Sequence, residues 1–232
     1  MCDMSGVEIT DTANKQAAVA STAHKAAAEA ADKFELRHQA LARRRLTSVQ
    51  ERLDAGRSLV RTLTQALAAE SFTQLVCPGN VVAAYVSMGT EIETRPLLAW
   101  LLERGCKVLV PKLGSGLEIG WSVLQSMDDL RAVDGHGHLR PDEPDGAVLP
   151  PEALAQADMV FAPALGVDSR GFRLGRGAGW YDRALAARQP GCPLVAVCWP
   201  WEVLEDDLPA EPHDVPADAV LTPSGYHMFT VQ

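Results

Sequence analysis

The stretch that decides the fold is Ala164-Leu-Gly-Val-Asp-Ser-Arg-Gly-Phe-Arg-Leu-Gly-Arg-Gly-Ala-Gly-Trp-Tyr-Asp-Arg183. The apolar run Met159-Val-Phe-Ala-Pro163 predicts a strand that leads into it, and Arg183-Ala-Leu-Ala-Ala-Arg188 predicts a helix that follows it. Four glycines lie between Gly171 and Gly179, and they free the backbone to turn tightly and to approach a ligand closely. The order strand, glycine loop, helix is typical of an α/β fold.

Arginines alternate with these glycines at Arg170, Arg173 and Arg176, and Arg183 follows. From Asp168 to Arg183 there are four arginines and two aspartates, although the whole chain has a formal net charge of -9. Guanidinium groups match phosphate oxygens in charge and shape, so a cluster of them in an acidic chain indicates an anionic ligand. We expect that ligand to meet the N-terminus of the helix, where free N–H groups favour anions.

Two known phosphate loops do not fit the stretch. The spacing is Gly175-x-Gly177-x-Gly179 and does not come directly after a strand, unlike the dinucleotide fingerprint G-x-G-x-x-G. No Lys-Ser or Lys-Thr follows, unlike the P-loop of NTPases. The alternative is a glycine-rich surface turn with solvated arginines. The combination of glycines, arginines and a Tyr-Asp pair opening a helix favours phosphate binding.

The segment RGFRLGRGAGWYD, residues 170–182, resembles the signature of the 5-formyltetrahydrofolate cyclo-ligase family, which typically reads R-L-G-x-G-x-G-Y-Y-D. The block Ser87-Met-Gly-Thr-Glu-Ile-Glu-Thr94 is a second match, and the resemblance runs from about Lys33 to Thr222. It implies that 5-formyltetrahydrofolate and ATP are converted to 5,10-methenyltetrahydrofolate, ADP and phosphate with Mg²⁺. The formyl oxygen would attack the γ-phosphate, and N10 would then close the ring as phosphate leaves.

The resemblance also implies an ATP site. Its residues lie in the signature and in Lys33-Phe-Glu-Leu-Arg37, which is similar to a K-x-x-L-R motif of the family. Without the resemblance, the latter segment would be read as a solvated helix face. The implied ATP-binding residues are Lys33, Arg37, Arg173, Gly175, Arg176, Gly177, Ala178, Gly179, Trp180 and Tyr181. The implied catalytic residues are Arg173, Arg176 and Tyr181, of which the two arginines would stabilise charge on the transferring phosphoryl group.

The implied folate and metal sites use further side chains. The folate residues are Val86, Met88, Glu91, Arg176 and Trp180. An ionised Glu91 suits the adjacent N–H donors of a pterin, since a carboxylate accepts two hydrogen bonds. Its alternative is a first-turn helix glutamate favoured by the helix dipole. Asp182 and Asp214 are the implied Mg²⁺ ligands, and two carboxylates beside substrate phosphates are enough for this ion.

Two signature positions depart from the family pattern. Trp180 replaces the usual first tyrosine, which keeps the stacking face but loses the hydroxyl group. Ala178 stands where some members have lysine, so one phosphate-binding cation is missing. These departures bear on rate and substrate fit more than on ATP binding.

Composition limits the class of protein. The chain has 232 residues, of which 47% are hydrophobic and 22% charged, as expected for a globular protein. A sequence pI near 5.1 argues against nucleic acid or an anionic membrane as a partner. Five scattered cysteines, without a metal or disulfide spacing, indicate a reduced, cytoplasmic protein. We expect a monomer that acts on small molecules, without a signal peptide or membrane span.

The chain order predicts one three-layer α/β domain over residues 31–232, with a mostly parallel sheet and N-terminal helices. Residues 1 to about 30 are rich in alanine and lack an apolar stripe, so we expect a disordered extension without a core of its own. Helices are expected at 33–45, from the capping box at 48–51 through residue 67, and at 94–104. The expected strands are 81–86, 107–111, 117–123, 159–163, 194–199 and a last one at 219–222.

Two rival functions remain open on sequence. A module that binds a phosphorylated metabolite or nucleotide would keep the arginines without needing Glu91 or both aspartates. A different ATP-dependent enzyme acting on a non-folate acid or amide would keep the ATP residues but not the folate pocket. The fold by itself separates none of these.

Overall fold

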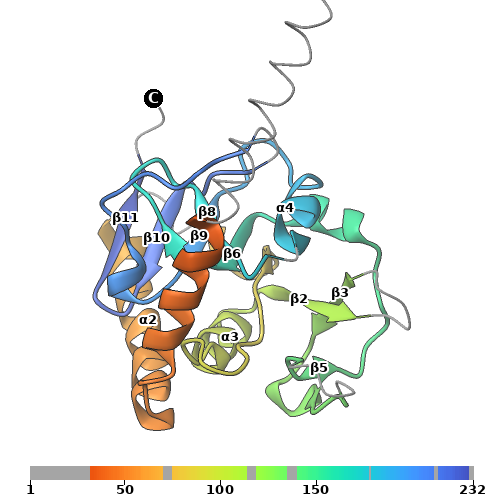
Figure 1. Ribbon diagram of the computed structural model, residues 1–232. Coiled ribbons are helices and arrows are strands. Elements are labelled where there is room, and N and C mark those ends of the chain that lie inside the picture. The colour runs from red at the N-terminus through yellow and green to blue at the C-terminus, as the bar shows by residue number, and fades with distance from the viewer. Residues whose placement is uncertain are drawn as a thin grey trace, which may run out of the picture.

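The computed structural model describes residues 32–69, 75–113, 119–134, 140–177, 179–211 and 214–229. The expected extension, residues 1–30, and the predicted ATP residue Ala178 lie outside these ranges. Within them, one seven-stranded sheet forms the centre of the molecule (Figure 1).

The central sheet is mostly parallel, as predicted. Its strand order is β11-β10-β9-β6-β1-β2-β3, and the five strands from β10 to β2 in this order run parallel. The strands are β1 Val81–Ala83, β2 Lys107–Leu113, β3 Ile119–Leu124, β6 Met159–Pro163, β9 Leu194–Val197, β10 Ala219–Thr222 and β11 Gly225–Met228. The near-continuous apolar runs of the central strands follow from burial on both faces.

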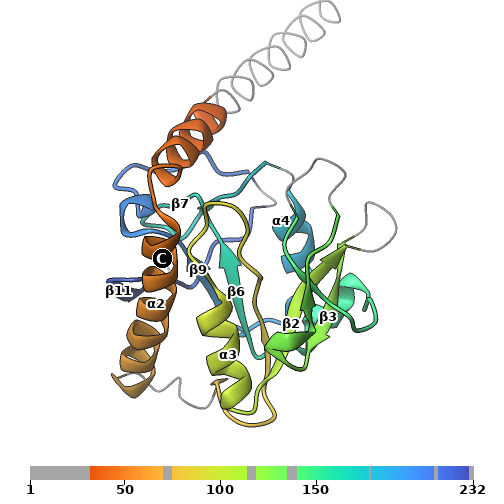
Figure 2. The same cartoon turned by 90° about the horizontal axis from the view of Figure 1, so that it is seen from below.

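Helices cover both faces and make three layers (Figures 1 and 2). One core cluster packs α2 (Val49–Ala69) and α3 (Arg95–Glu103) against the sheet, with Leu59, Leu97 and Phe161 fully buried. The other packs α4 (Trp180–Leu185) and the 3-10 helix η3 (Pro151–Gln156) against the opposite face. Alternate residues of each strand pack into one core or the other, because successive side chains of a strand point to opposite faces of the sheet.

The two N-terminal helices form where predicted. Residues 32–44 are helical, and Ser48 begins α2 with a reciprocal capping box: its Oγ accepts from Glu51 N at 3.1 Å, and Glu51 Oε2 accepts from Ser48 N at 2.7 Å. The spacing of α2 predicts an apolar stripe of Val49, Leu53, Val60, Leu63 and Leu67. Leu63 and Leu67 are buried and Leu53 and Val60 are partly buried, but Val49 is exposed and the fully buried Leu59 was not in the stripe.

The edges of the sheet differ from the prediction. The strand at 219–222 is not the last, since β11 continues from it as an antiparallel hairpin strand. Gly225–Met228 is only partly buried, so it lacks the apolar run from which the other strands were predicted. β3 is antiparallel to β2 and forms the opposite edge, while β1 has three residues instead of the six predicted.

Short elements complete the chain. The small strands are β4 Leu130–Arg131, β5 Glu143–Pro144, β7 Gly166–Val167 and β8 Arg173–Leu174. Two further 3-10 helices in the described residues are η2 Met127–Asp129 and η4 Pro200–Glu202. β7 and β8 pair as an antiparallel hairpin outside the central sheet, and β8 leads directly into the glycine loop. The expectation that no strand precedes this loop was therefore wrong, although the strand has only two residues.

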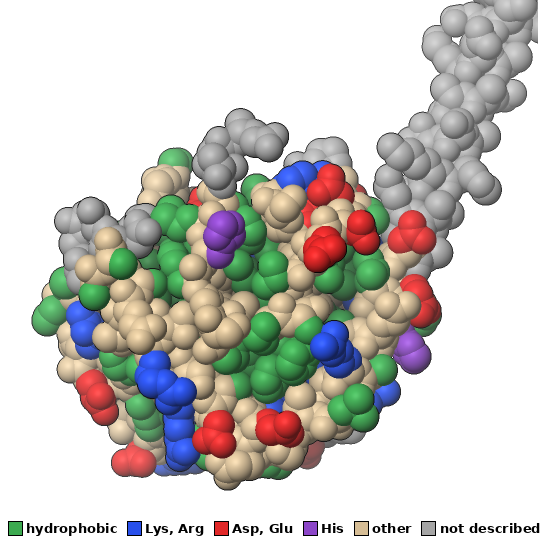
Figure 3. Space-filling model, turned by 90° about the vertical axis from the view of Figure 1, so that its left-hand side faces the viewer, with side chains coloured by type: hydrophobic (Ala, Val, Ile, Leu, Met, Phe, Trp, Pro, Cys, Tyr) green, Lys and Arg blue, Asp and Glu red, His purple; other side chains and the backbone are tan. Residues whose placement is uncertain are grey.

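The surface shows charges of both signs. On the face in Figure 3, basic and acidic side chains are interspersed among hydrophobic and other groups. Within the described ranges, no helix is both long and apolar enough to cross a membrane.

Candidate functional site

The N-terminal helix brings Arg37 to the glycine loop and Lys33 to the C-terminal segment. Arg37 Nε donates to the carbonyl oxygen of Gly175 at 2.9 Å, across 138 residues of sequence. Lys33 Nζ lies 3.3 Å from Asp214 Oδ2 and 3.3 Å from Glu211 Oε1. The N-terminal helix therefore contacts both the glycine loop and the segment around Asp214.

The glycine loop, which we call the signature loop (residues 175–179), needs glycine at specific places. Gly177 has φ +99° and Gly179 has φ +60°, a backbone region that side chains disfavour. A Cβ built on Gly177 would lie 3.6 Å from the Arg37 guanidinium, so the loop backbone stands close to a cation. Gly179 is the N-cap of α4, which begins at Trp180, earlier than the helix predicted from Arg183. Trp180, Tyr181 and Asp182 thus occupy its first turn.

Arg170, the first arginine of the cluster, is not directed to a ligand. Its guanidinium and backbone N–H bind the fully buried Asp168, whose carboxylate also accepts from Phe172 N and Leu208 N. Asp168 therefore organises the turn that precedes the signature loop. Sequence reasoning counted both residues only as charges, since their pairing depends on the turn itself.

The buried side chain of Arg173 forms an ion pair with the partly exposed Asp182. Its Nη2 lies 3.1 Å from Asp182 Oδ1, and its side chain is 4% exposed against 31% for Asp182. Burial lowers the pKa of Arg173, although the charge of Asp182 raises it. Within the described residues its Nε has no hydrogen-bond partner, which leaves a donor available beside the loop.

Arg176 extends from the signature loop to Glu91, which follows β1. The Arg176 Nε lies 3.3 Å from Glu91 Oε1, and Glu91 Oε2 accepts from the backbone N of Met88 at 2.9 Å. Burial raises the pKa of Glu91, and the Arg176 charge partly offsets this rise. Glu91 lies in the turn before the N-cap Thr94 of α3, so it is not a first-turn helix glutamate. This position removes the alternative that the sequence left open.

A cavity of about 320 Å³ adjoins this carboxylate. It is lined by Val49, Arg52, Leu53, Ser87, Met88, Gly89, Glu91, Glu93 and Arg95. Two predicted folate residues, Met88 and Glu91, therefore share one cavity. Val86 is 4% exposed and belongs to the core behind it, so it does not line this space.

Two aromatic rings lie in the first turn of α4. Trp180 packs edge-on against Tyr181, with ring centroids 4.4 Å apart, and lies 5.5 Å from the ring of Trp121. Burial raises the pKa of Tyr181 well above its ordinary value. Trp121 is 1% exposed, and its Nε1 has no hydrogen-bond partner in the described part of the chain. The sequence did not single out this tryptophan, because it was one apolar residue of an alternating strand.

The two predicted metal ligands lie on the same side of the site. The charges of Asp182 and Asp214 both act on Arg173, and each aspartate is bonded to a cation, Arg173 or Lys33. Their oxygens are the ligand type that Mg²⁺ prefers, and this ion needs few carboxylates when phosphates are present. Across the described ranges, no cluster of three or more His, Cys, Asp or Glu could hold a metal alone. The donor set therefore fits an ion shared with a phosphate ligand.

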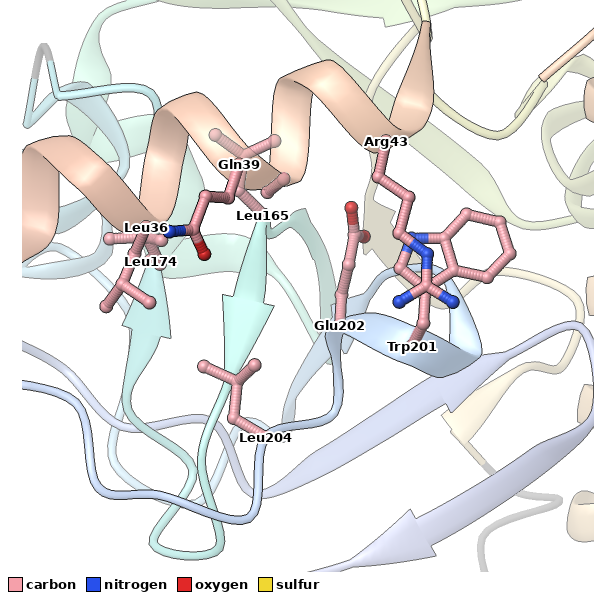
Figure 4. Close-up of a pocket in the computed structure, with 9 residues that line it drawn as sticks. Leu36, Gln39, Arg43, Leu165, Leu174, Trp201, Glu202 and Leu204 are labelled. Carbon is pink, nitrogen blue, oxygen red and sulfur yellow. The ribbon is translucent and has the colours of Figure 1, made fainter. Parts of the chain in front are cut away.

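A second cavity, of about 230 Å³, lies between the N-terminal helix and the β7–β8 hairpin (Figure 4). It is lined by Leu36, Gln39, Ala40, Arg43, Leu165, Leu174, Trp201, Glu202 and Leu204. None of the predicted site residues lines it. Its walls belong to the seam that attaches the N-terminal helix to the domain.

Comparison with known proteins gives consistent matches. The family description "5-formyltetrahydrofolate cyclo-ligase family" matches residues 29–223. The 5-formyltetrahydrofolate cyclo-ligase of Mycolicibacterium smegmatis is 42% identical over 150 residues, which cover 62% of this chain and 74% of that protein. The Escherichia coli K12 protein of the same name is 30% identical over 159 residues, 64% of this chain and 81% of that one. The solved structure of Aquifex aeolicus 5,10-methenyltetrahydrofolate synthetase has a TM-score of 0.64 and 27% identity, covering 86% of this chain and 94% of that one.

Proposed function

Because this chain belongs to the 5-formyltetrahydrofolate cyclo-ligase family, we propose that its signature loop and the turn after β1 hold the two substrates side by side. The enzyme uses ATP to convert 5-formyltetrahydrofolate to 5,10-methenyltetrahydrofolate, with release of ADP and phosphate. The contact between Arg176 and Glu91 carries the proposal, because it joins the phosphate-binding loop to the carboxylate expected to bind folate.

ATP is assigned to the signature loop and the N-terminal helix. Lys33, Arg37, Arg173 and Arg176 supply positive charge, and the loop glycines allow the backbone N–H groups to face phosphate oxygens. The Arg173 Nε, buried and without a partner among the described residues, is a donor suited to a phosphate oxygen. Tyr181 and Trp180 would pack beside the bound substrates. Ala178 remains part of the proposed loop by its place in the sequence.

The folate site is assigned to Glu91, Met88 and Trp180, with Val86 as the buried support behind them. Glu91 is held by Arg176 and Met88 N, so its carboxylate is oriented before the substrate arrives. Its remaining acceptor capacity can take N–H donors of the pterin.

Mg²⁺ is assigned to Asp182 and Asp214 together with the phosphates of ATP. When bound there, the ion would neutralise charge on the phosphate oxygens. For that to happen, Arg173 and Lys33 would exchange their aspartate contacts for phosphate contacts, since both cations stand beside the same loop.

The residues of this chain then act mainly by positioning and charge. Arg176 would contact both the folate and the γ-phosphate of ATP, and so would orient the formyl oxygen toward that phosphate. Arg173 and Arg176 together would stabilise the charge that develops on the transferring phosphoryl group. No covalent enzyme intermediate is needed. N10 of the folate closes the ring within the same cavity, and phosphate leaves.

Absorbance tests this function directly. Mixing the protein with 5-formyltetrahydrofolate and Mg-ATP should produce the near-ultraviolet absorbance of the methenyl product. A module that only binds phosphorylated metabolites would bind ATP and give no absorbance change. A ligase for a different acid or amide would release phosphate only with that other substrate.

Replacing Glu91 by glutamine should weaken folate binding much more than ATP binding. The amide keeps the shape but presents an N–H₂ group where the pterin needs an acceptor, a loss of about 1–3 kcal/mol or roughly 5- to 150-fold in affinity. Calorimetry with each ligand measures both affinities. Glu103→Gln, at the last position of α3, is the matched control and should change neither. Equal losses for both ligands would contradict the assignment.

The pH dependence of the reaction should also report on Glu91. Because burial raises the pKa of Glu91 above its ordinary 4.5, the active carboxylate is lost on acidification at a higher pH than for a solvated glutamate. The logarithm of kcat/KM should therefore fall as pH drops through this raised value. The Glu91→Gln variant should lack that limb of the profile, and a limb identical to that of the parent would assign it to another group.

We assign residues 31–232 to one cyclo-ligase domain that acts as a monomer in the cytoplasm, a place supported by the free thiols of Cys106, Cys192 and Cys198. Residues 1–30 are assigned to an extension outside that domain.

Deleting residues 1–24 should leave the melting temperature and turnover nearly unchanged, because their composition provides no apolar stripe to bury. A large drop in either value would show that this segment packs on the domain.

A further inference from the structure

The N-terminal helix is attached to the domain mainly by polar contacts. Its largest apolar side chain, Phe34, is 68% exposed, and Leu46 just beyond its end is 84% exposed. Leu36, Ala40 and Leu41 are only partly buried against the β7–β8 hairpin. Apolar packing alone therefore holds this helix only weakly against the domain, and the cavity between the two agrees with this (Figure 4).

One contact on this helix is fully buried. Arg44 Nε and Nη2 each lie 2.7 Å from a carboxylate oxygen of Glu202, and Nη2 also donates to the carbonyl oxygen of Ala164 at 2.6 Å. The two side chains are 3% and 2% exposed. Glu202 Oε2 in turn accepts from Trp199 N at 2.9 Å. In Figure 4 the Glu202 carboxylate points from η4 toward the helix.

This pair ties the helix to two segments of the domain at once. Glu202 belongs to η4, which follows the central strand β9, and Ala164 connects β6 with the β7–β8 hairpin that leads into the signature loop. A two-pronged guanidinium–carboxylate contact has one favoured geometry, whereas apolar side chains can slide past each other. The pair therefore fixes both the position and the rotation of the helix.

The same helix face carries the proposed ATP contacts. Lys33, Arg37 and Arg44 follow each other at spacings of four and seven residues, which place them on one side of an α-helix. Arg44 lies two turns, about 10 Å along the axis, from Arg37. Any rotation of the helix at Arg44 would move the Arg37 and Lys33 side chains relative to the signature loop. The charge of Arg44 also acts on the Glu91 carboxylate, which connects the pair electrostatically to the folate side.

We propose that Arg44 and Glu202 are positioning residues for the cyclo-ligase reaction: their buried pair holds the N-terminal helix so that Lys33 and Arg37 meet ATP at the signature loop. The pair is too buried to contact the nucleotide, so it acts through the helix. This inference rests on the proposed ATP contacts of Lys33 and Arg37.

A pair of apolar replacements separates positioning from stability. Arg44→Met and Glu202→Leu should each lower the melting temperature strongly, since each leaves one buried charge without its partner. The double variant should recover most of this loss, because well-packed apolar residues can replace a buried ion pair. We expect the double variant nevertheless to show a KM for ATP raised at least tenfold, with the KM for 5-formyltetrahydrofolate within about twofold of the parent.

A double variant that regains its melting temperature and has the parental KM for ATP overturns the inference. If it does not fold, Arg44→Lys decides: the point charge keeps the attraction but not the fork, so the KM for ATP should rise several-fold, and a parental value again contradicts positioning. The matched control is the exposed pair of α2, replaced as Arg57→Met with Asp54→Leu, which should change neither temperature nor KM.

The variant Lys33→Ala, made in the parent protein, separates a failure of the positioning role from a failure of the proposed ATP site. If Lys33→Ala leaves the KM for ATP unchanged, the ATP assignment of the helix is wrong and the inference falls with it. If Lys33→Ala raises that KM and the Arg44 and Glu202 variants do not, the ATP assignment stands and only the positioning role is rejected.

Discussion

Replacing Arg176 by alanine is expected to lower turnover by roughly a hundredfold or more, which corresponds to about 3 kcal/mol of lost transition-state stabilisation. Among the proposed catalytic residues, Arg176 is the one that contacts Glu91, the carboxylate assigned to folate binding: its Nε lies 3.3 Å from Glu91 Oε1. It should act on the phosphoryl oxygens directly, so the loss should appear at every Mg²⁺ concentration. Arg176→Lys should restore only part of the rate, since a point charge cannot reproduce the two-pronged contact.

A second readout of the same variant comes from Glu91. The Arg176 charge lowers the pKa of this buried carboxyl, so its removal should raise that pKa further. The acid limb of the pH–rate profile should therefore move to higher pH in Arg176→Ala and less in Arg176→Lys. The exposed Arg61→Ala on α2, where Arg61 bonds only to Ser58 among the residues described, is the matched control. A parental rate and acid limb in Arg176→Ala would show that the signature arginine is a solvated surface group.

Replacing Asp182 by asparagine should change both the metal requirement and the stability. An amide is a weaker ligand for a hard cation, so the Mg²⁺ concentration for half-maximal rate should rise and the maximal rate should fall. The variant also leaves the buried Arg173 without its ion-pair partner, which typically costs about 1–3 kcal/mol or more. The partial exposure of Asp182 places the expected loss toward the low end of that range.

Two matched variants separate these effects. Asp214→Asn should shift the metal titration in the same direction with a smaller loss of stability, since the Lys33 side chain is 15% exposed, against 4% for Arg173, and water can replace part of the lost contact. Asp54→Asn, on the exposed face of α2, should shift neither. Metal titrations of turnover and thermal melts of the three variants measure both quantities. A parental half-maximal Mg²⁺ concentration in both Asp182→Asn and Asp214→Asn would remove these aspartates from the metal site.

The sequence by itself determined the elements whose signals are local. The capping box at Ser48, the apolar runs of the central strands and the glycine loop before α4 all depend on residues close together in the chain. Their periodicity and composition follow from burial on one face or two, and so the parallel α/β architecture could be predicted. The candidate site residues could be proposed because most of them lie in three short motifs, residues 33–37, 87–94 and 170–182, and their roles stay predictions.

What only the tertiary structure decided is which of these residues touch one another. Glu91 meets Arg176, Arg37 meets the Gly175 carbonyl, and Trp121 reaches Trp180 across separations that no local pattern encodes. In the sequence Arg44 is the middle of three consecutive arginines, residues 43–45, yet it pairs with Glu202 at a separation of 158 residues. A side chain's free energy depends on its surroundings after folding. Burial therefore turned Arg44 from an apparent surface charge into a structural one, and Arg170, although exposed, is held by the buried Asp168.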